Sequence, residues 1–169
     1  MPDLIEQFRN AFRGYPAGVS IVTATVDGQP VGMTMSSLSS LAIDPLSVAF
    51  SISQPGGAGS AMLNASTYLI HLLAAEQAEL AGIFARKGSI RFTPEQGWDR
   101  LPTGEPWLPD APAAIRARPL SMLKVGTAHL VVAEVLGVTC GPAADPLGYH
   151  DRTFLTVSDL KEAGQLLAD

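Results

Sequence analysis

Residues 19–35, VSIVTATVDGQPVGMTM, place two β-rich runs on either side of a tight turn. Asp27-Gly28 is a strong hairpin signal, because both residue types tolerate the positive φ angles that two-residue hairpin turns require. Further β-rich runs follow at residues 46–53, 67–73, 113–124 and 129–138. The alternation of strands and helices that builds a doubly wound sheet is absent from this pattern. The sequence predicts a mainly β fold of about six or seven strands.

Helices are expected only at the periphery of these strands. Residues 3–13 carry apolar side chains at helical spacing, with Asp3 as N-cap and Gly14 as the stop. Residues 75–85 and 158–168 predict two more helices, the second capped by Ser158. The run at 129–138 is almost continuously apolar, which predicts cover on both faces, by helices outside a small barrel or by a second subunit. We expect one domain over residues 1–169.

Composition narrows the class of protein. The 169 residues are 47% hydrophobic and 16% charged, which excludes a disordered chain and favours additional buried surface such as a subunit interface. A net charge of −5 gives no basic footprint for nucleic acid, and no apolar run reaches membrane-spanning length. The acidic N-terminal helix pattern is not typical of a signal peptide, and the lone Cys140 excludes an internal disulfide. We expect a cytoplasmic protein.

Residues 32–50, GMTMSSLSSLAIDPLSVAF, combine many hydroxyl groups with threaded Met and Leu side chains. Hydroxyls and free backbone N–H groups can hold a phosphate or the polar edge of a flat heterocycle. The alternative is a barrel-edge segment whose hydroxyls satisfy their own backbone. Composition alone leaves both interpretations open.

Other motifs are weaker. PGGAGSA, residues 55–61, begins like a dinucleotide fingerprint, but Met62 stands where the third glycine belongs, which argues against a Rossmann domain. Its N–H groups could still face a phosphate near Ser60, or the segment could be an ordinary turn. Arg86, Lys87 and Arg91 could neutralise a ligand phosphate or form a solvated cluster at a helix end.

The three histidines are far apart in the sequence. His71 falls within a strand pattern, His129 begins a strand, and His150 lies in GYHDRTF. No HExxH pattern or Cys/His cluster accompanies them, so the sequence predicts no metal site. A structural role is the simpler interpretation for each one considered alone.

In order and spacing, several segments together resemble the flavin reductase family with the FMN-binding split-barrel fold. They are FRGYPAGVSIVTA, DGQPVGMTMSSLSSLAIDPLSVAFSIS, FARKGSIRF, GWDRLPTGEPWLPDAPAAIRARP, VGTAHLVVAEVLGV and PLGYHDRTF, and they cover nearly the whole chain. The family supplies the short reductase components of two-component monooxygenases. The resemblance implies a mainly β split β-barrel with peripheral helices, assembled as a homodimer with the flavin near the interface.

The resemblance also implies roles for individual residues. Backbone amides and hydroxyls of one loop would contact flavin, from Thr34, Met35, Ser36, Ser37 and Ser40. The ribityl and phosphate side would be lined by Ser53, Gln54, Ser60 and Ala61, and the site closed by Phe84, Ala85 and Arg91. The nicotinamide side would involve His129, Tyr149 and His150.

One motif departs from the family pattern. GTAH, residues 126–129, replaces the usual GDH, so Ala128 takes the histidine position. Because side chains alternate along a strand, His129 would face the opposite side unless a local bulge brings it back.

The implied activity is that of an NAD(P)H:flavin oxidoreductase, with FMN or FAD as acceptor and NADH or NADPH as donor. Hydride transfer between nicotinamide and flavin N5 needs no side-chain acid or base, because the cofactor carries the chemistry. Reduced flavin would then diffuse to a partner flavin-dependent monooxygenase. Two alternatives stay open: a non-enzymatic flavin-binding or electron-carrying protein of the same fold, and a split-barrel interaction module that has lost flavin.

Overall fold

The computed structural model describes residues 3–53 and 56–159, and its centre is one antiparallel seven-stranded sheet. The strand order is β3-β2-β6-β9-β10-β5-β4. The bounds are β2 (Ser20–Val26), β3 (Gln29–Met35), β4 (Ser39–Ile43), β5 (Leu46–Ile52), β6 (Tyr68–Leu72), β9 (Ala113–Val125) and β10 (Ala128–Cys140). Asp27 and Gly28 have φ angles of 51° and 74°, which confirms the predicted hairpin between β2 and β3.

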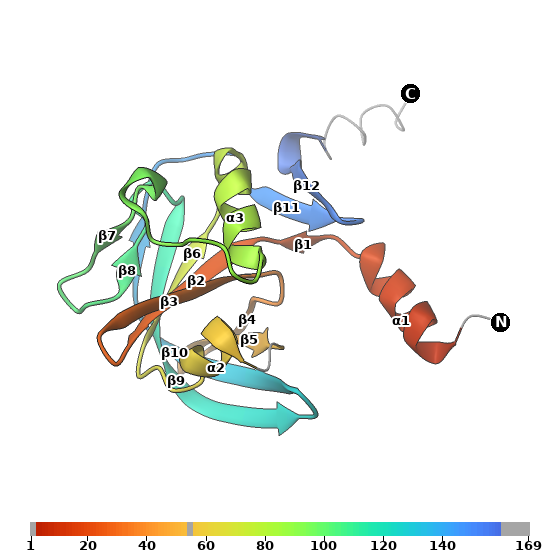
Figure 1. The fold of residues 1–169 in the computed structure, drawn as a ribbon, viewed down its shortest axis with the longest axis horizontal. Coiled ribbons are helices and arrows are strands. Elements are labelled where there is room, and N and C mark those ends of the chain that lie inside the picture. Colours follow the sequence, from red (N-terminus) through yellow and green to blue (C-terminus); the bar gives the residue numbers. More distant parts are fainter. Residues whose placement is uncertain (1–2, 54–55, 160–169) are drawn as a thin grey trace.

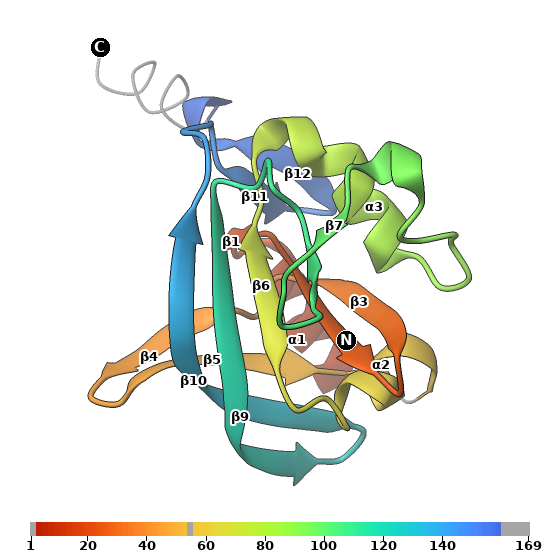
Figure 2. The same cartoon turned by 90° about the vertical axis from the view of Figure 1, so that its left-hand side faces the viewer.

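Smaller elements surround this sheet (Figure 1). A second sheet has the order β1-β11-β12, from β1 (Ala17–Gly18), β11 (Leu147–His150) and β12 (Thr153–Thr156), and β7 (Asp99–Arg100) pairs with β8 (Pro106–Trp107). The helices are α1 (Leu4–Arg13), α2 (Gly57–Met62), α3 (Ala78–Ala85) and the 3-10 turns η1 (Ala75–Gln77) and η2 (Pro94–Gln96). Helix α1 extends away from the sheet, while α3 and β11–β12 lie at one end of the molecule and α2 lies toward the other (Figures 1 and 2).

The barrel is split between β3 and β4. These strands form the two edges of the sheet and are joined by residues 36–38, yet they are not paired with each other. One apolar core fills the inside of the curled sheet around Phe50, Tyr68 and Val131. A second core, around Ile21 and Phe84, lies between the sheet, α3 and the long loop before β9. The predicted mainly β split barrel with peripheral helices is confirmed.

Six strands were not foreseen from the sequence, namely β1, β4, β7, β8, β11 and β12. The serine-rich stretch contains β4, an edge strand with Leu41 and Ile43 54% and 87% exposed. Helix α1 is confirmed with its Asp3 cap, whose carboxylate accepts the Glu6 N–H.

The C-terminal cap was predicted wrongly. Thr156 rather than Ser158 caps the turn at residues 157–159, because the Thr156 hydroxyl accepts the Asp159 N–H at 3.0 Å and the Asp159 carboxylate accepts the Thr156 N–H. Residues 160–168 of that predicted helix lie outside the described residues.

The expectation that helices cover both faces of β10 is also wrong. Within this chain Val131 and Ala133 are fully buried, but Leu130 and Leu136 on the same strand are both 42% exposed. None of the described helices packs extensively against β10, whose main contacts are with β9 and β5.

A buried histidine joins the long loop to the sheet. The Nδ1–H of His71 donates to the Ile21 carbonyl oxygen at 3.1 Å, and Nε2 accepts the Leu108 N–H at 3.2 Å. The ring also packs edge-on against Trp98, with centroids 5.4 Å apart. These two partners require a neutral imidazole, and burial lowers the pKa of His71 from 6.5 to about 4. The predicted structural role of His71 is what the contacts support.

The stability of the fold should therefore fall in mild acid. Between pH 6.5 and 4, His71 is protonated in the unfolded chain but neutral in the folded chain. The free energy of unfolding therefore rises with pH across this window. We expect a loss of about 2 kcal/mol at pH 5 relative to pH 8 from this group. Urea unfolding at both pH values measures it, and His71→Gln should flatten the dependence. An equal slope in the variant would exclude His71 as the cause.

Glu105 is a buried carboxylate with a complete set of partners. It accepts hydrogen bonds from Thr67 Oγ1 at 2.6 Å, from Arg116 Nε at 2.7 Å and from the Thr103 hydroxyl. Burial alone would raise the pKa of Glu105. Hydrogen bonds outweigh this effect and hold the pKa below its usual value, and they come from Thr103, Thr67, the backbone N–H of Glu105 and Arg116. The carboxylate thus ties the β7–β8 hairpin to β9 and to the start of β6.

No described helix is long and apolar enough to cross a membrane. Over residues 3–53 and 56–159, no group of three or more His, Cys, Asp or Glu side chains is placed to hold a metal ion.

Candidate functional site

A pocket of about 360 Å³ opens where the end of β3 meets α3 and the β11–β12 hairpin. It is lined by Val19, Thr34, Ser36, Gly82, Ala85, Arg86, Tyr149, Arg152 and Phe154. Four segments that are separate in the sequence therefore meet at this place. The pocket lies beside the split in the barrel, because Ser36 begins the connection between the two unpaired edge strands.

Local contacts explain the shape of this pocket. The Thr34 hydroxyl donates to the Ala81 carbonyl oxygen at 2.6 Å, which fastens β3 to α3. Gly82 faces the open space, since a Cβ built on it would meet only the tip of Arg86, at 4.0 Å. On the third side the Tyr149 ring packs against Phe154, with centroids 5.4 Å apart. The result is a slot with hydroxyl groups on one wall and an aromatic ring on another.

The structure brings together four of the residues predicted for the site. Thr34, Ser36 and Ala85 were assigned to flavin, and Tyr149 to the nicotinamide side. Arg86, named only as part of a basic cluster, lines the same pocket. Four lining residues were missed: Val19, Gly82, Arg152 and Phe154. The only available signal was that Arg152 and Phe154 follow His150 in GYHDRTF.

Three other predicted residues lie behind the pocket. The side chains of Met35 and Phe84 are 4% and 1% exposed, each within one of the two cores. Arg91 donates to the carbonyl oxygens of Gly32 and Arg86, both at 2.7 Å, and its guanidinium lies 5.4 Å from the Phe84 ring. Burial lowers the pKa of Arg91. Arg91 thus holds residues 86–91 against β3, and a direct contact with flavin stays a prediction.

Two predicted serines lie at the edges of the split. The Ser37 hydroxyl accepts the Ser51 N–H at 2.9 Å and so fastens the connection to β5. Ser40 lies on β4 and lines a separate apolar groove with Val138. Neither lines the pocket beside α3, so their flavin contacts stay predictions.

The remaining flavin residues lie near α2. The Ser60 hydroxyl accepts the Gly56 N–H at 2.8 Å, and Gly56 rather than Ser60 is the N-cap of α2. Ser53 is exposed at the end of β5, and Ala61 is half-buried. Gln54 lies outside the described residues. The phosphate side proposed for this group is untested.

The side predicted for His129 agrees with the strand register. His129 pairs with Ile52 and Lys124, and no bulge interrupts β10 from Ala128 to Val132. Because strand side chains alternate, His129 shares its face with buried Val131 and Ala128 takes the opposite face. The bulge that could have brought His129 back does not form. His150 follows Tyr149 on β11 and does not line the pocket, so nicotinamide roles for His129 and His150 stay predictions.

Comparison with known proteins identifies the chain. The family model described as a flavin reductase like domain matches residues 12–158. The chain belongs to the flavin reductase family.

Relatives of this flavin reductase agree with that assignment. An NADH:FMN oxidoreductase of Rhodococcus qingshengii is 38% identical over 151 residues, covering 87% of this chain and 79% of the relative. The reductase component of a 4-nitrophenol 4-monooxygenase/4-nitrocatechol 2-monooxygenase from Rhodococcus opacus is 34% identical, over 88% of this chain and 78% of the relative. The crystal structure of a flavin reductase domain protein from Arthrobacter sp. FB24 has a TM-score of 0.82 at 28% identity, covering 89% and 93% of the two chains.

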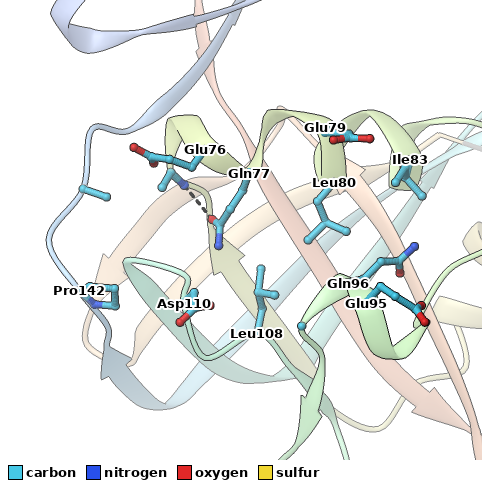
Figure 3. Close-up of a pocket in the computed structure, with 13 residues that line it drawn as sticks. Glu76, Gln77, Glu79, Leu80, Ile83, Glu95, Gln96, Leu108, Asp110 and Pro142 are labelled. Atoms are coloured by element: carbon cyan, nitrogen blue, oxygen red, sulfur yellow. Dashed lines mark hydrogen bonds between the residues drawn. The ribbon is translucent and has the colours of Figure 1, made fainter.

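The flavin reductase also has a larger cavity, of about 700 Å³, on another side of α3 (Figure 3). Leu80 and Leu108 point into it, and acidic side chains stand around it from Glu76, Glu79, Glu95 and Asp110. It contains none of the residues predicted for flavin or nicotinamide. Carboxylates would repel the phosphates of either nucleotide. The smaller pocket is therefore the candidate site, despite its smaller volume.

Proposed function

We propose that this flavin reductase transfers hydride from NADH or NADPH to FMN or FAD, and that the reduced flavin serves a partner monooxygenase. The observation that carries the proposal is the pocket that joins Thr34 and Ser36 to Tyr149. It unites a wall assigned to flavin with a wall assigned to the nicotinamide. The relative from Rhodococcus qingshengii, an NADH:FMN oxidoreductase, supports the reaction, and the reductase component from Rhodococcus opacus supports the role.

The residues of the pocket fit a flat heterocycle. Gly82 leaves space that a long side chain would occupy, and Ser36 offers an exposed hydroxyl beside the split. Hydrogen-bond donors on this wall would fix the polar edge of a ring and stabilise negative charge there. Tyr149 offers an aromatic face for stacking. When bound, flavin supplies the hydride acceptor, and the chain's own residues orient the two rings and exclude water.

Steady-state NADH oxidation tests the proposal. Purified protein should consume NADH or NADPH only when FMN or FAD is added, with saturation in both substrates. No turnover with either nucleotide, in protein shown by its spectrum to bind flavin, would refute the enzyme and support the electron-carrier alternative. No flavin affinity at all would support the interaction module instead.

We further propose that the protein is a homodimer. Strands β9 and β10 carry Leu120, Leu123, Leu130 and Leu136, each more than 40% exposed, and Leu123 pairs with Leu130 on the face opposite buried Val131. A separate apolar groove of about 310 Å³, on the side of the sheet that carries Val48 and Ile115, is lined by Leu41, Ile43 and Leu46. Exposed apolar surface of this kind marks an interface, and a second copy offers the same apolar surface in return.

The molar mass of the protein in solution tests the proposed homodimer. We expect the wild-type mass to be twice that of one chain, and Leu130→Glu to shift it toward the monomer. Lys124→Glu, at an exposed polar position on the paired strand, is the matched control and should stay dimeric. A wild-type monomer at micromolar concentration would refute the dimer.

We also propose a cytoplasmic location, since the exposed free thiol of Cys140 fits a reducing compartment.

A further inference from the structure

Two arginines stand at the mouth of the pocket on different elements. Arg86 is the C-cap residue of α3, and Arg152 lies in the turn between β11 and β12. Over residues 3–53 and 56–159, neither guanidinium has an ion pair or a hydrogen bond, whereas those of Arg13, Arg91 and Arg116 all have partners. In a chain of net charge −5, this leaves two uncompensated cations facing one slot.

The backbone at Arg152 is strained. His150 pairs with Thr153, so Asp151 and Arg152 form a two-residue hairpin turn, with φ angles of 44° and 65°. Such turns favour glycine or asparagine, and a long side chain in this region costs about 1 kcal/mol. The turn is also fastened, because the Asp151 N–H donates to the Arg13 carbonyl oxygen at 3.0 Å. A strained arginine fixed at the mouth of a pocket points to a role in binding.

The surroundings indicate which anion these arginines meet. Arg152 shares its hairpin with Tyr149, the residue on the nicotinamide wall. The residues assigned to the flavin phosphate, around Ser60 on α2, do not line this pocket, and α2 lies toward the opposite end of the molecule from β11–β12 (Figures 1 and 2). Guanidinium groups bind phosphate oxygens with paired hydrogen bonds. A dinucleotide whose nicotinamide lay against Tyr149 would bring its phosphates toward this rim.

We propose that Arg152, together with Arg86, binds the phosphate groups of the nicotinamide dinucleotide and sets its KM. The inference rests on the proposed function, because it concerns the hydride donor of the same site. Neither arginine takes part in the hydride transfer itself. Their contribution is to hold the donor against the slot, so it should change KM far more than kcat.

Steady-state kinetics with saturating FMN tests this proposal. Arg152→Gly suits the turn geometry and should keep the fold, while raising the KM for NADH about tenfold with kcat little changed. Arg86→Ala combined with Arg152→Gly should raise it further, and Arg152→Lys should restore part of the loss. Lys87→Ala is the matched control, since Lys87 is an exposed cation next to Arg86 that does not line the pocket. Its KM should match that of the wild type.

Comparison of substrates identifies the phosphates involved. Equal KM increases for NADH and NADPH support contact with the shared diphosphate, and a larger increase for NADPH supports additional contact with the 2′-phosphate. An increase in the KM for FMN that disappears with riboflavin would overturn the proposal in favour of the flavin phosphate, and so would an unchanged KM for both nucleotides. If wild-type protein shows no turnover, the proposed function fails separately. Fluorescence titration of NADH binding to wild type and Arg152→Gly then decides the arginine proposal, and equal affinities refute it.

Discussion

Gly82→Leu should lower the kcat/KM of flavin-dependent NADH oxidation by about 100-fold or more, without loss of stability. Gly82 lies in α3 with nothing but the Arg86 tip within 4 Å of a built Cβ, so the leucine side chain enters the pocket between Thr34 and Tyr149. Leucine also has a higher helix propensity than glycine, which should leave the free energy of unfolding unchanged or raised. The substitution therefore separates the effect on kcat/KM from any loss in the free energy of unfolding.

Steady-state rates and urea unfolding on the same preparations measure both effects. Gly82→Ala is the control, because a single methyl group fills little of the pocket and should stabilise the helix by about 0.5–1 kcal/mol. If Gly82→Leu turned over FMN and NADH at the wild-type rate, hydride transfer would have to occur elsewhere on the protein.

Glu105→Ala should lower the free energy of unfolding by about 3–5 kcal/mol. Removing the carboxylate leaves the Arg116 guanidinium, 28% exposed, without its partner at 2.7 Å, and it frees the hydroxyls of Thr67 and Thr103. A loss of this size is a large fraction of the total stability of a single domain.

Urea unfolding with a matched surface pair measures this contribution. Arg118 and Glu134 form an ion pair at 2.6 Å with side chains 57% and 27% exposed, so Glu134→Ala should cost less than about 1 kcal/mol. Glu105→Gln keeps the shape of the side chain and should fall between the two. Equal losses for Glu105→Ala and Glu134→Ala would show that burial of the Glu105 network adds nothing.

Short sequence patterns predicted the elements that are specified by residues adjacent in the sequence. The Asp27-Gly28 turn and the Asp3 cap were both found in advance, because each depends on residues adjacent in sequence. The β11–β12 hairpin escaped notice, since Asp151-Arg152 lacks the glycine or asparagine that usually marks such a turn. Strand β4 escaped for another reason: its residues, SSLAI, do not alternate between apolar and polar, so the two-residue period of a half-buried strand is absent.

The site was predictable only in part, for a related reason. Thr34, Ser36, Ala85 and Tyr149 came from resemblance to a family, and the structure brings them into one pocket. Gly82 and Arg152 line the same pocket through contacts between β3, α3 and β11–β12, which no local pattern reports. The side taken by His129 was predictable, because it depends only on the two-residue period of an uninterrupted strand.

Anaerobic mixing of the protein with oxidised FMN and NADH measures the proposed hydride transfer itself. We expect the visible absorbance of oxidised flavin to disappear as one NADH is consumed for each flavin reduced, at a rate that depends on protein concentration. Flavin that binds the protein and yet stays oxidised in excess NADH and NADPH would contradict it.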